Sequence, residues 1–204
     1  KWVYTVTLLI VGISILGASR VRTFGYILDG ISPKDKLYKD LKFYEKHFDG
    51  LFPFEIWIDT KEPGSVKDLA TLTKIETLCK ELKTYDELSK PLAVTEMLKF
   101  MNQAYYNGNP RRYLLPNPLD MGRIMSYFPQ ETDARNADLI SSMIDSTYQV
   151  TRVSLKIADV GTTRNLEITR AVEAKIDSIF PKEEYDVHVT GKSVITVKGN
   201  GYLI

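Results

Sequence analysis

Residues 2–19 read WVYTVTLLIVGISILGAS and contain no charged side chain, whereas Lys1 precedes them and Arg20 and Arg22 follow. At a rise of about 1.5 Å per residue, a helix of this length covers roughly 27 Å, close to the hydrocarbon thickness of a bilayer. Trp2 and Tyr4 lie near one end, where amphipathic rings favour the membrane interface. We therefore predict one transmembrane helix over residues 1–20, followed by a domain that folds in water.

Two other interpretations of this stretch stay open. A secretory signal peptide would use the small residues 17–19 as its cleavage site, although the apolar run is long for a signal. A buried core helix of a soluble domain is the second alternative, but no charged face marks a side for solvent. Because Lys1 is not an initiator Met, we expect the chain to be part of a longer or processed protein.

Composition excludes some classes of partner. The chain has 27 Lys and Arg against 26 Asp and Glu, so no basic field for nucleic acid is expected. The single cysteine, Cys79, rules out an internal disulfide, and its place in an apolar helical row predicts a small core residue.

The first part of the domain reads as a helix, a strand and a helix. Residues 21–51 are predicted to leave the membrane and then form an amphipathic helix that starts near Ser32. In residues 52–59, FPFEIWID, apolar side chains alternate with polar ones, which indicates a half-buried strand. A turn at residues 61–64 leads to a long helix that starts at Ser65 and ends near Leu82, and residues 85–88 are assigned to a short strand.

Residues 89–136 are predicted to form a mostly helical insertion. Apolar residues recur at helical spacing over residues 94–105 and 119–128, and a loop rich in Asn, Gly and Pro joins the two stretches. The flexible and aromatic side chains of these helices are candidates for lining a site for apolar ligands: Met97, Met101, Tyr105, Met125 and Phe128. The alternative that they only close a small core is favoured, because periodic apolar rows usually serve packing.

The C-terminal half completes an α+β fold. Residues 139–146 and 149–157 are predicted to form a hairpin, followed by a helix that ends at Pro181 and by a strand over residues 185–190. Residues 52–88 and 137–191 then give the order of a ferredoxin-like split βαβ sandwich, with an antiparallel sheet and two long helices on one face. Residues 192–204 are expected to return towards the membrane.

No pattern in the sequence carries a reaction. His47 and His188 lack partners at metal-ligand spacing. Gly191-Lys192-Ser193 resembles the end of a phosphate loop, but the glycine that the motif needs five residues earlier is Asp186. No serine lies in a nucleophile elbow. We therefore predict no catalytic residue, no cofactor and no metal, and we expect that the protein is not an enzyme.

Several segments resemble the large extracytoplasmic loop of transporters of the resistance-nodulation-division (RND) superfamily, in the MMPL-like or lipid-exporter branch. The similar segments are 27–33 (ILDGISP), 43–50 (FYEKHFDG), 54–59 (FEIWID), 88–89 (LS), 98–102 (LKFMN) and 189–191 (VTG), the last as the turn by which the loop heads back to the membrane. The resemblance implies a bacterial inner-membrane protein of about a dozen helices in two repeats, whose porter-like loops lie in the periplasm. It also implies efflux driven by protons, with a hydrophobic or lipid-like molecule, the membrane and a second porter-like loop as partners.

Two other functions remain as alternatives. An extracytoplasmic sensor domain of a membrane signalling receptor would also have a membrane helix on either side. A membrane-tethered hydrolase is disfavoured, because no pair of nucleophile and base is evident.

Overall fold

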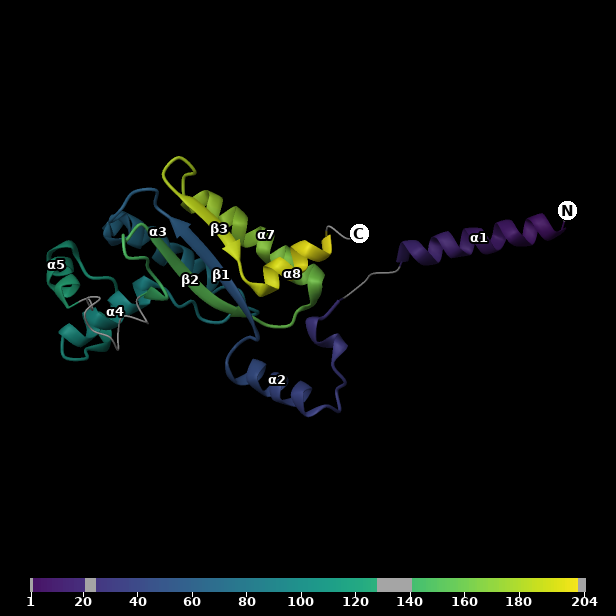
Figure 1. Cartoon of the computed structure of the whole chain (residues 1–204), viewed down its shortest axis with the longest axis horizontal. Coiled ribbons are helices and arrows are strands. Elements are labelled where there is room, and N and C mark those ends of the chain that lie inside the picture. The colour runs from purple at the N-terminus through teal and green to yellow at the C-terminus, as the bar shows by residue number, and fades with distance from the viewer. Residues whose placement is uncertain (1, 21–24, 128–140, 202–204) are drawn as a thin grey trace.

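The computed structural model describes residues 2–20, 25–127 and 141–201. Helix α1 (Trp2–Arg20) lies apart from the α+β domain formed by the other described residues (Figure 1). Its described side chains, at residues 2–17, are all exposed. The helix predicted over residues 1–20 is therefore present. The membrane span is not found: within the described part of the chain, no helix combines the length and the apolar character that crossing a membrane requires.

The domain is built on a three-stranded antiparallel sheet in the described residues. Its order is β2 (Val150–Ile157), β1 (Phe52–Asp59) and β3 (Asp186–Thr190), so that β1 is central. Ile56 lies opposite Val153 on one side and opposite Val189 on the other. The strand predicted at residues 52–59 is confirmed at both ends, and its alternation is confirmed as well, since Phe54, Ile56 and Ile58 are buried.

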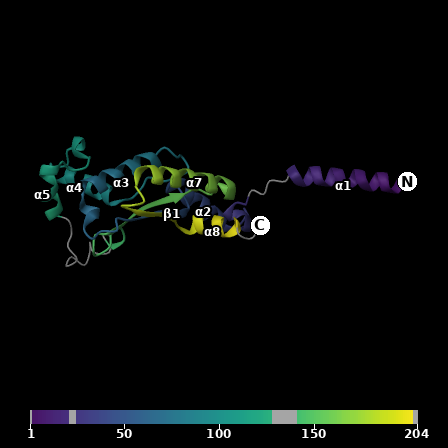
Figure 2. The same ribbon diagram turned by 90° about the horizontal axis from the view of Figure 1, so that it is seen from above.

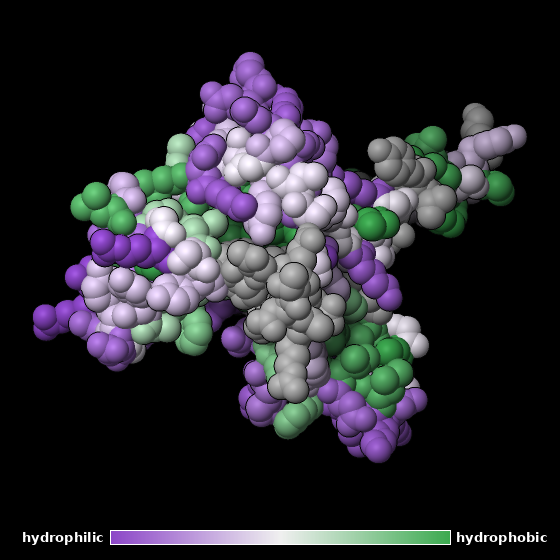
Figure 3. All heavy atoms as spheres, turned by 60° about the vertical axis from the view of Figure 1, so that its left-hand side comes forward, coloured by the Kyte–Doolittle hydropathy of each residue, from purple (hydrophilic) through white to green (hydrophobic). Residues whose placement is uncertain are grey.

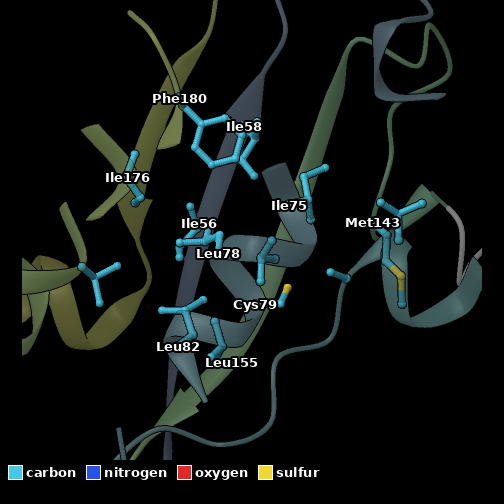
Figure 4. Close-up of a cluster of buried hydrophobic side chains, with 14 of the residues drawn as sticks. Ile56, Ile58, Ile75, Leu78, Cys79, Leu82, Met143, Leu155, Ile176 and Phe180 are labelled. Atoms are coloured by element: carbon cyan, nitrogen blue, oxygen red, sulfur yellow. The ribbon is translucent and has the colours of Figure 1, made fainter. Parts of the chain in front are cut away.

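Two long helices cover the buried face of this sheet. Helix α3 (Leu69–Leu82) follows the 3₁₀ turn η2 (Ser65–Lys67), and α7 (Gly161–Ile179) lies beside it (Figure 2). Side chains from β1, β2, α3 and α7 meet in one core that includes Cys79 (Figure 4). The α+β class and the antiparallel sheet are therefore confirmed. The helix expected to start at Ser65 begins only at Leu69, because the 3₁₀ turn precedes it.

Two predicted strands are wrong in the described residues. Residues 85–88 form a turn, and Leu88 makes only an isolated bridge to Ile157. Of the strand expected at 139–146, residues 139 and 140 lie outside the described part, and Ile144 makes a single bridge to Thr151. The local cause is Asp145, whose carboxylate accepts the backbone N–H groups of Gln149 and Val150 and folds the chain into a turn.

The remaining elements surround this core. Helix α2 (Lys36–His47) precedes β1, and its N-cap is Asp35 rather than Ser32, because Asp35 accepts the N–H of Leu37. The 3₁₀ turn η1 (Ile27–Gly30) lies before α2. Up to Tyr127, where the described part ends, the segment predicted as the insertion contains α4 (Val94–Tyr105), η3 (Pro110–Arg112) and α5 (Pro118–Ser126).

Residues 192–201 form a helix that the sequence pattern did not indicate. Helix α8 (Lys192–Gly201) buries Ser193 and Val194 against the start of β1, and the Ser193 hydroxyl donates to the carbonyl oxygen of Pro53 at 2.9 Å. The tight turn before it needs Gly191, whose φ is +111°. This segment is therefore part of the packed domain.

Candidate functional site

The face of the sheet opposite the core is open and carries polar and aromatic side chains. Trp57 is 51% exposed at its centre, with Arg152 opposite it on β2 and His188 opposite it on β3. Arg152 forms an ion pair with Glu55 at 3.5 Å. A pocket of about 260 Å³ lies beside Trp57 and reaches residues 141–145. This face is therefore accessible to a ligand or a partner.

Helix α2 covers one end of the open face without packing tightly on it. None of its residues is buried, and Leu37, Phe43 and the C-cap Phe48 are each more than half exposed. Figure 3 shows apolar surface in green low in the view, towards α2. A polar contact ties α2 to the loop after β2: the N–H of Asp159 donates to the carboxylate of Glu45 at 2.6 Å. The apolar face of α2, next to the open face of the sheet, is therefore only partly covered by other side chains.

A groove of about 540 Å³ lies between α2 and the sheet, and we call it the α2 groove. Tyr44 and Phe48 form the wall on the helix side, with ring centroids 4.5 Å apart in a stacked arrangement. The other walls come from the loop after α2, from the start of β1, from the end of β2 and from the segment before α4; their residues are Asp49, Leu51, Pro53, Glu55, Ser89, Lys90, Leu92, Ser154, Leu155 and Lys156. The groove therefore joins segments that are distant in the sequence.

The side chain of Lys156 joins the strand side of the α2 groove to the two rings of its helix side. Its ammonium group donates to the hydroxyl of Tyr44 at 2.5 Å and lies 4.6 Å from the ring centroid of Tyr44 and 5.3 Å from that of Phe48. Both distances are in the range of cation–π attraction. The backbone N–H of Lys156 donates to the hydroxyl of Ser89 at 2.8 Å, which fixes the strand beneath the side chain.

A glycine sets the close approach of the loop to Lys156. Gly50 has φ +141°, and a Cβ at this position would lie 2.7 Å from the Cβ of Lys156. No other residue fits there without moving the strand, because real Cβ contacts of this length essentially do not occur. Gly50 therefore positions Phe48 and Leu51 over the sheet.

The chemistry of the α2 groove favours binding over reaction. Phe48, Leu51 and Leu92 offer apolar surface, and Lys90 and Lys156 offer positive charge beside the carboxylates of Asp49 and Glu55. An amphipathic molecule would place its apolar part on the rings and its polar group among these charges. Among the described residues, no group of three or more His, Cys, Asp or Glu side chains converges to hold a metal.

The residues predicted to line a ligand site lie elsewhere, in the insertion. Met97 and Met101 on α4 and Met125 on α5 are partly buried and pack against the core, and Tyr105 is 38% exposed. Phe128 lies outside the described residues. The α2 groove and the pocket beside Trp57 are lined by other residues. A role for the methionines in binding stays a prediction.

A second polar cluster joins the insertion to the core and has a structural character. Lys99 on α4, only 7% exposed in its side chain, lies 2.7 Å from Glu96 and 3.1 Å from Glu76 of α3. Burial acts to raise the pKa of Glu96, but hydrogen bonds from Lys99, Tyr113 and Lys83 outweigh it and lower that pKa to about 2. Burial acts to lower the pKa of Lys99, and its hydrogen bonds to the two carboxylates raise it.

Cys79 lies beside this cluster, fully buried. Its burial raises the pKa of the thiol to about 12, so the reactive thiolate is suppressed. The predicted role of Cys79 as a core residue is confirmed. His188 is exposed and lies 3.1 Å from Asp186, as expected for the polar side of a strand.

The sequence did not single out the α2 groove. The apolar face of α2 was visible as a periodic row, and the alternation of β1 and β2 places Glu55, Trp57 and Lys156 on the open face. The turn at Gly50 brings Tyr44 to Lys156, and no local pattern shows which distant segment the chain approaches after this turn. In comparisons with known proteins, no family matches the chain, and no curated protein matches it either.

Proposed function

We propose that the chain is an extracytoplasmic substrate-handling domain of a proton-driven exporter of the RND type, and that the α2 groove receives a hydrophobic or lipid-like molecule. The observation that carries the proposal is the α2 groove itself. It combines stacked rings with an ammonium group and has a volume of about 540 Å³, within the range of about 300–1,000 Å³ typical of ligand pockets.

The finer fold that we propose is the ferredoxin-like sandwich. In that arrangement the strand that follows α3, the first helix of the sandwich, would pair with the outer edge of β2. Residues 87–92 occupy this position: the N–H of Ser89 donates to the carbonyl of Lys156, and Leu92 and Ser154 exchange two backbone hydrogen bonds. Along the chain, α4 and α5 then lie between this edge segment and β2. The order of the elements supports a porter-like domain with a helical insertion more than it supports a sensor.

The proposal includes residues 1–20 as the membrane anchor. No helix of the described residues meets the requirements of a span, yet α1 exposes apolar side chains on every side, among them Leu8, Ile10 and Ile13. A helix that is apolar all round is stable only in an apolar environment. The expected behaviour is that the chain needs detergent or lipid to stay monomeric, whereas residues 21–204 dissolve without it. Good aqueous solubility of the whole chain as a monomer would contradict this part.

Photo-crosslinking tests the α2 groove directly. The whole chain is placed in lipid nanodiscs with a diazirine-labelled fatty acid, and labelled peptides are identified by mass spectrometry. We expect labels at residues 44–51, 89–92 and 154–156. Ser154→Trp fills the groove and should lower labelling of these peptides about tenfold, whereas Ser178→Trp, on an exposed part of α7, should not. Equal labelling in both variants would refute the assignment of the groove.

The proposed role in transport is tested by reading the full gene that encodes this chain. The proposal requires that the reading frame containing this chain also encode about a dozen apolar spans, with acidic residues within the central ones. A kinase or a methyl-accepting coiled coil downstream would instead establish the sensor alternative. These two tests are independent, because a groove that binds lipid can exist in either class of protein.

A further inference from the structure

Strand β3 forms an edge of the sheet among the described residues. It pairs with β1 on one side only, with His188 opposite Trp57. Thr60 donates to Gln149 on the β2 side, and the two sides of an antiparallel strand alternate. In β1, the backbone N–H and C=O groups of the even-numbered residues therefore point towards β2. Those of the odd-numbered residues, such as Trp57, point towards β3, where Trp57 lies opposite His188. By the same alternation, Val187 and Val189 turn their N–H and C=O groups to the open edge.

A hollow lies along this edge. It has a volume of about 440 Å³ and is bounded by β3 and by the C-terminal half of α7. Ile176 and Phe180 contribute apolar surface to it. The charges at its rim are paired within the chain, since Lys198 lies 2.9 Å from Glu173 and Lys182 lies 3.1 Å from Asp177. The hollow thus offers room beside the unpaired edge without a strong net field.

The sequence of β3 is complementary to itself in one antiparallel register. With Val187 opposite Val187 of another copy, Asp186 lies opposite His188 on the open face, and this pair occurs twice by symmetry. On the core side, Val189 lies opposite Tyr185, also twice. Cross-strand pairs of side chains that hydrogen-bond to each other, and pairs of an aromatic with a β-branched side chain, both stabilise antiparallel sheets. In this register the outward backbone groups of Val187 meet those of Val187 in the other copy. Those of Val189 face Tyr185, which lies just before β3 and whose own N–H donates to the carbonyl of Pro181 at 2.9 Å.

We propose that β3 pairs with β3 of a second copy of this chain, antiparallel and centred on Val187, so that one sheet runs through both protomers. The Asp186 carboxylate is a hydrogen-bond acceptor and the His188 imidazole can donate a ring N–H, and this complementarity selects this occupant and this register. The two side chains already attract each other within one strand, at 3.1 Å, and both are more than half exposed. In the dimer the two aspartates and two histidines form one alternating cluster. The contact is isologous, as a two-fold dimer requires. It does not depend on the α2 groove.

Disulfide trapping of the whole chain in detergent tests the contact. Val187→Cys brings two thiols together at the centre of the proposed register, within the separation that a disulfide spans. Cys79 is buried with a suppressed thiolate, so it adds no background. We expect a linked dimer to form at least tenfold faster for Val187→Cys than for Ser178→Cys, an exposed position on α7. Equal rates would mean that α1 or random collision brings the chains together, and would overturn the proposal.

Register is tested separately. His188→Cys should crosslink more slowly than Val187→Cys, and the reverse order would overturn the register centred on Val187. Asp186→His and His188→Asp each place like side chains opposite each other, so each should weaken the dimer at least fivefold in sedimentation velocity. The double variant restores both pairs and should recover the dimer. A chain that stays monomeric at high concentration, with no crosslink at residue 187, would refute self-pairing and leave the edge to an extended segment of another protein.

Discussion

Replacing Lys99 by Met removes the cation that joins α4 to α3. The change keeps an unbranched side chain of similar length, so it tests charge rather than volume. Lys99 is buried between Glu76 and Glu96, whose side chains are only 14% and 15% exposed. Without Lys99, both carboxylates stay largely buried with fewer partners. Among the residues that the structure describes, Glu76 keeps only Lys80 at 4.0 Å, while Glu96 keeps Lys83 and the hydroxyl of Tyr113.

The expected loss follows from this inventory. Removing one partner of a buried ion pair costs about 3–5 kcal/mol, because an uncompensated charge remains. Since Glu96 keeps two hydrogen-bond donors, we expect the lower end, about 3 kcal/mol in the free energy of unfolding. For a chain of this size, that corresponds to a fall in Tm of roughly 6–12 °C.

Thermal unfolding followed by circular dichroism measures the effect. Lys182→Met is the matched control, because Lys182 pairs with Asp177 at the surface, where such pairs contribute about 0–1 kcal/mol. The triple variant Glu76→Gln, Glu96→Gln, Lys99→Met removes all three charges and should recover most of the loss. A fall in Tm below about 2 °C for Lys99→Met would show that the cluster does not hold the insertion to the core.

Two further predictions concern acid and backbone strain. The pKa of Glu96 is lowered to about 2 from its ordinary 4.5, so its stabilising contribution is complete above pH 4.5 and is lost as the pH falls towards 2. Acid titration of Lys99→Met should show a shallower loss of stability in this window, and an unchanged slope would contradict the assignment. Gly191→Ala should lower the free energy of unfolding in urea more than Gly64→Ala does. Both glycines have a positive φ, which costs an alanine about 1–3 kcal/mol. Only at Gly191 would the new Cβ also meet a backbone oxygen, that of Pro53 at 2.5 Å. Equal losses would refute this reasoning.

A strand is predicted correctly where its alternating apolar pattern coincides with pairing to neighbouring strands. β1 alternates over its whole length and pairs on both sides, so its bounds matched the apolar pattern. Residues 139–146 showed similar apolar content, but Asp145 diverts the backbone by accepting its N–H groups. Residues 85–88 are too few for an apolar pattern to distinguish a strand from a turn, and they form a turn. Local hydrogen bonds decided both cases.

The candidate site was less predictable than the fold. The methionines of α4 and α5 attracted notice because of their side-chain chemistry, yet they pack against the core. Lys156 attracted none, because alternation with apolar neighbours reads as the solvent side of a strand. Its meeting with Tyr44 joins residues 112 positions apart. Helix α8 was missed because its pattern is weak, and its burial rests on Ser193 and Val194 beside β1.

The sequence by itself determined the class of the fold, the central strand, the core face of α3 and the buried state of Cys79, since each depends on a local period of apolar side chains. It also determined that α1 is apolar on every side. Only the tertiary structure decided that α2 stands off the sheet and leaves a groove, that Lys99 lies between two carboxylates, and that β3 is an edge. The physical reason is common to these cases. The spacing of apolar residues along a helix or strand determines which of its faces is buried. The element that it packs against is determined by turns, such as those at Gly50 and Gly191, and by the packing of segments that are distant in the sequence.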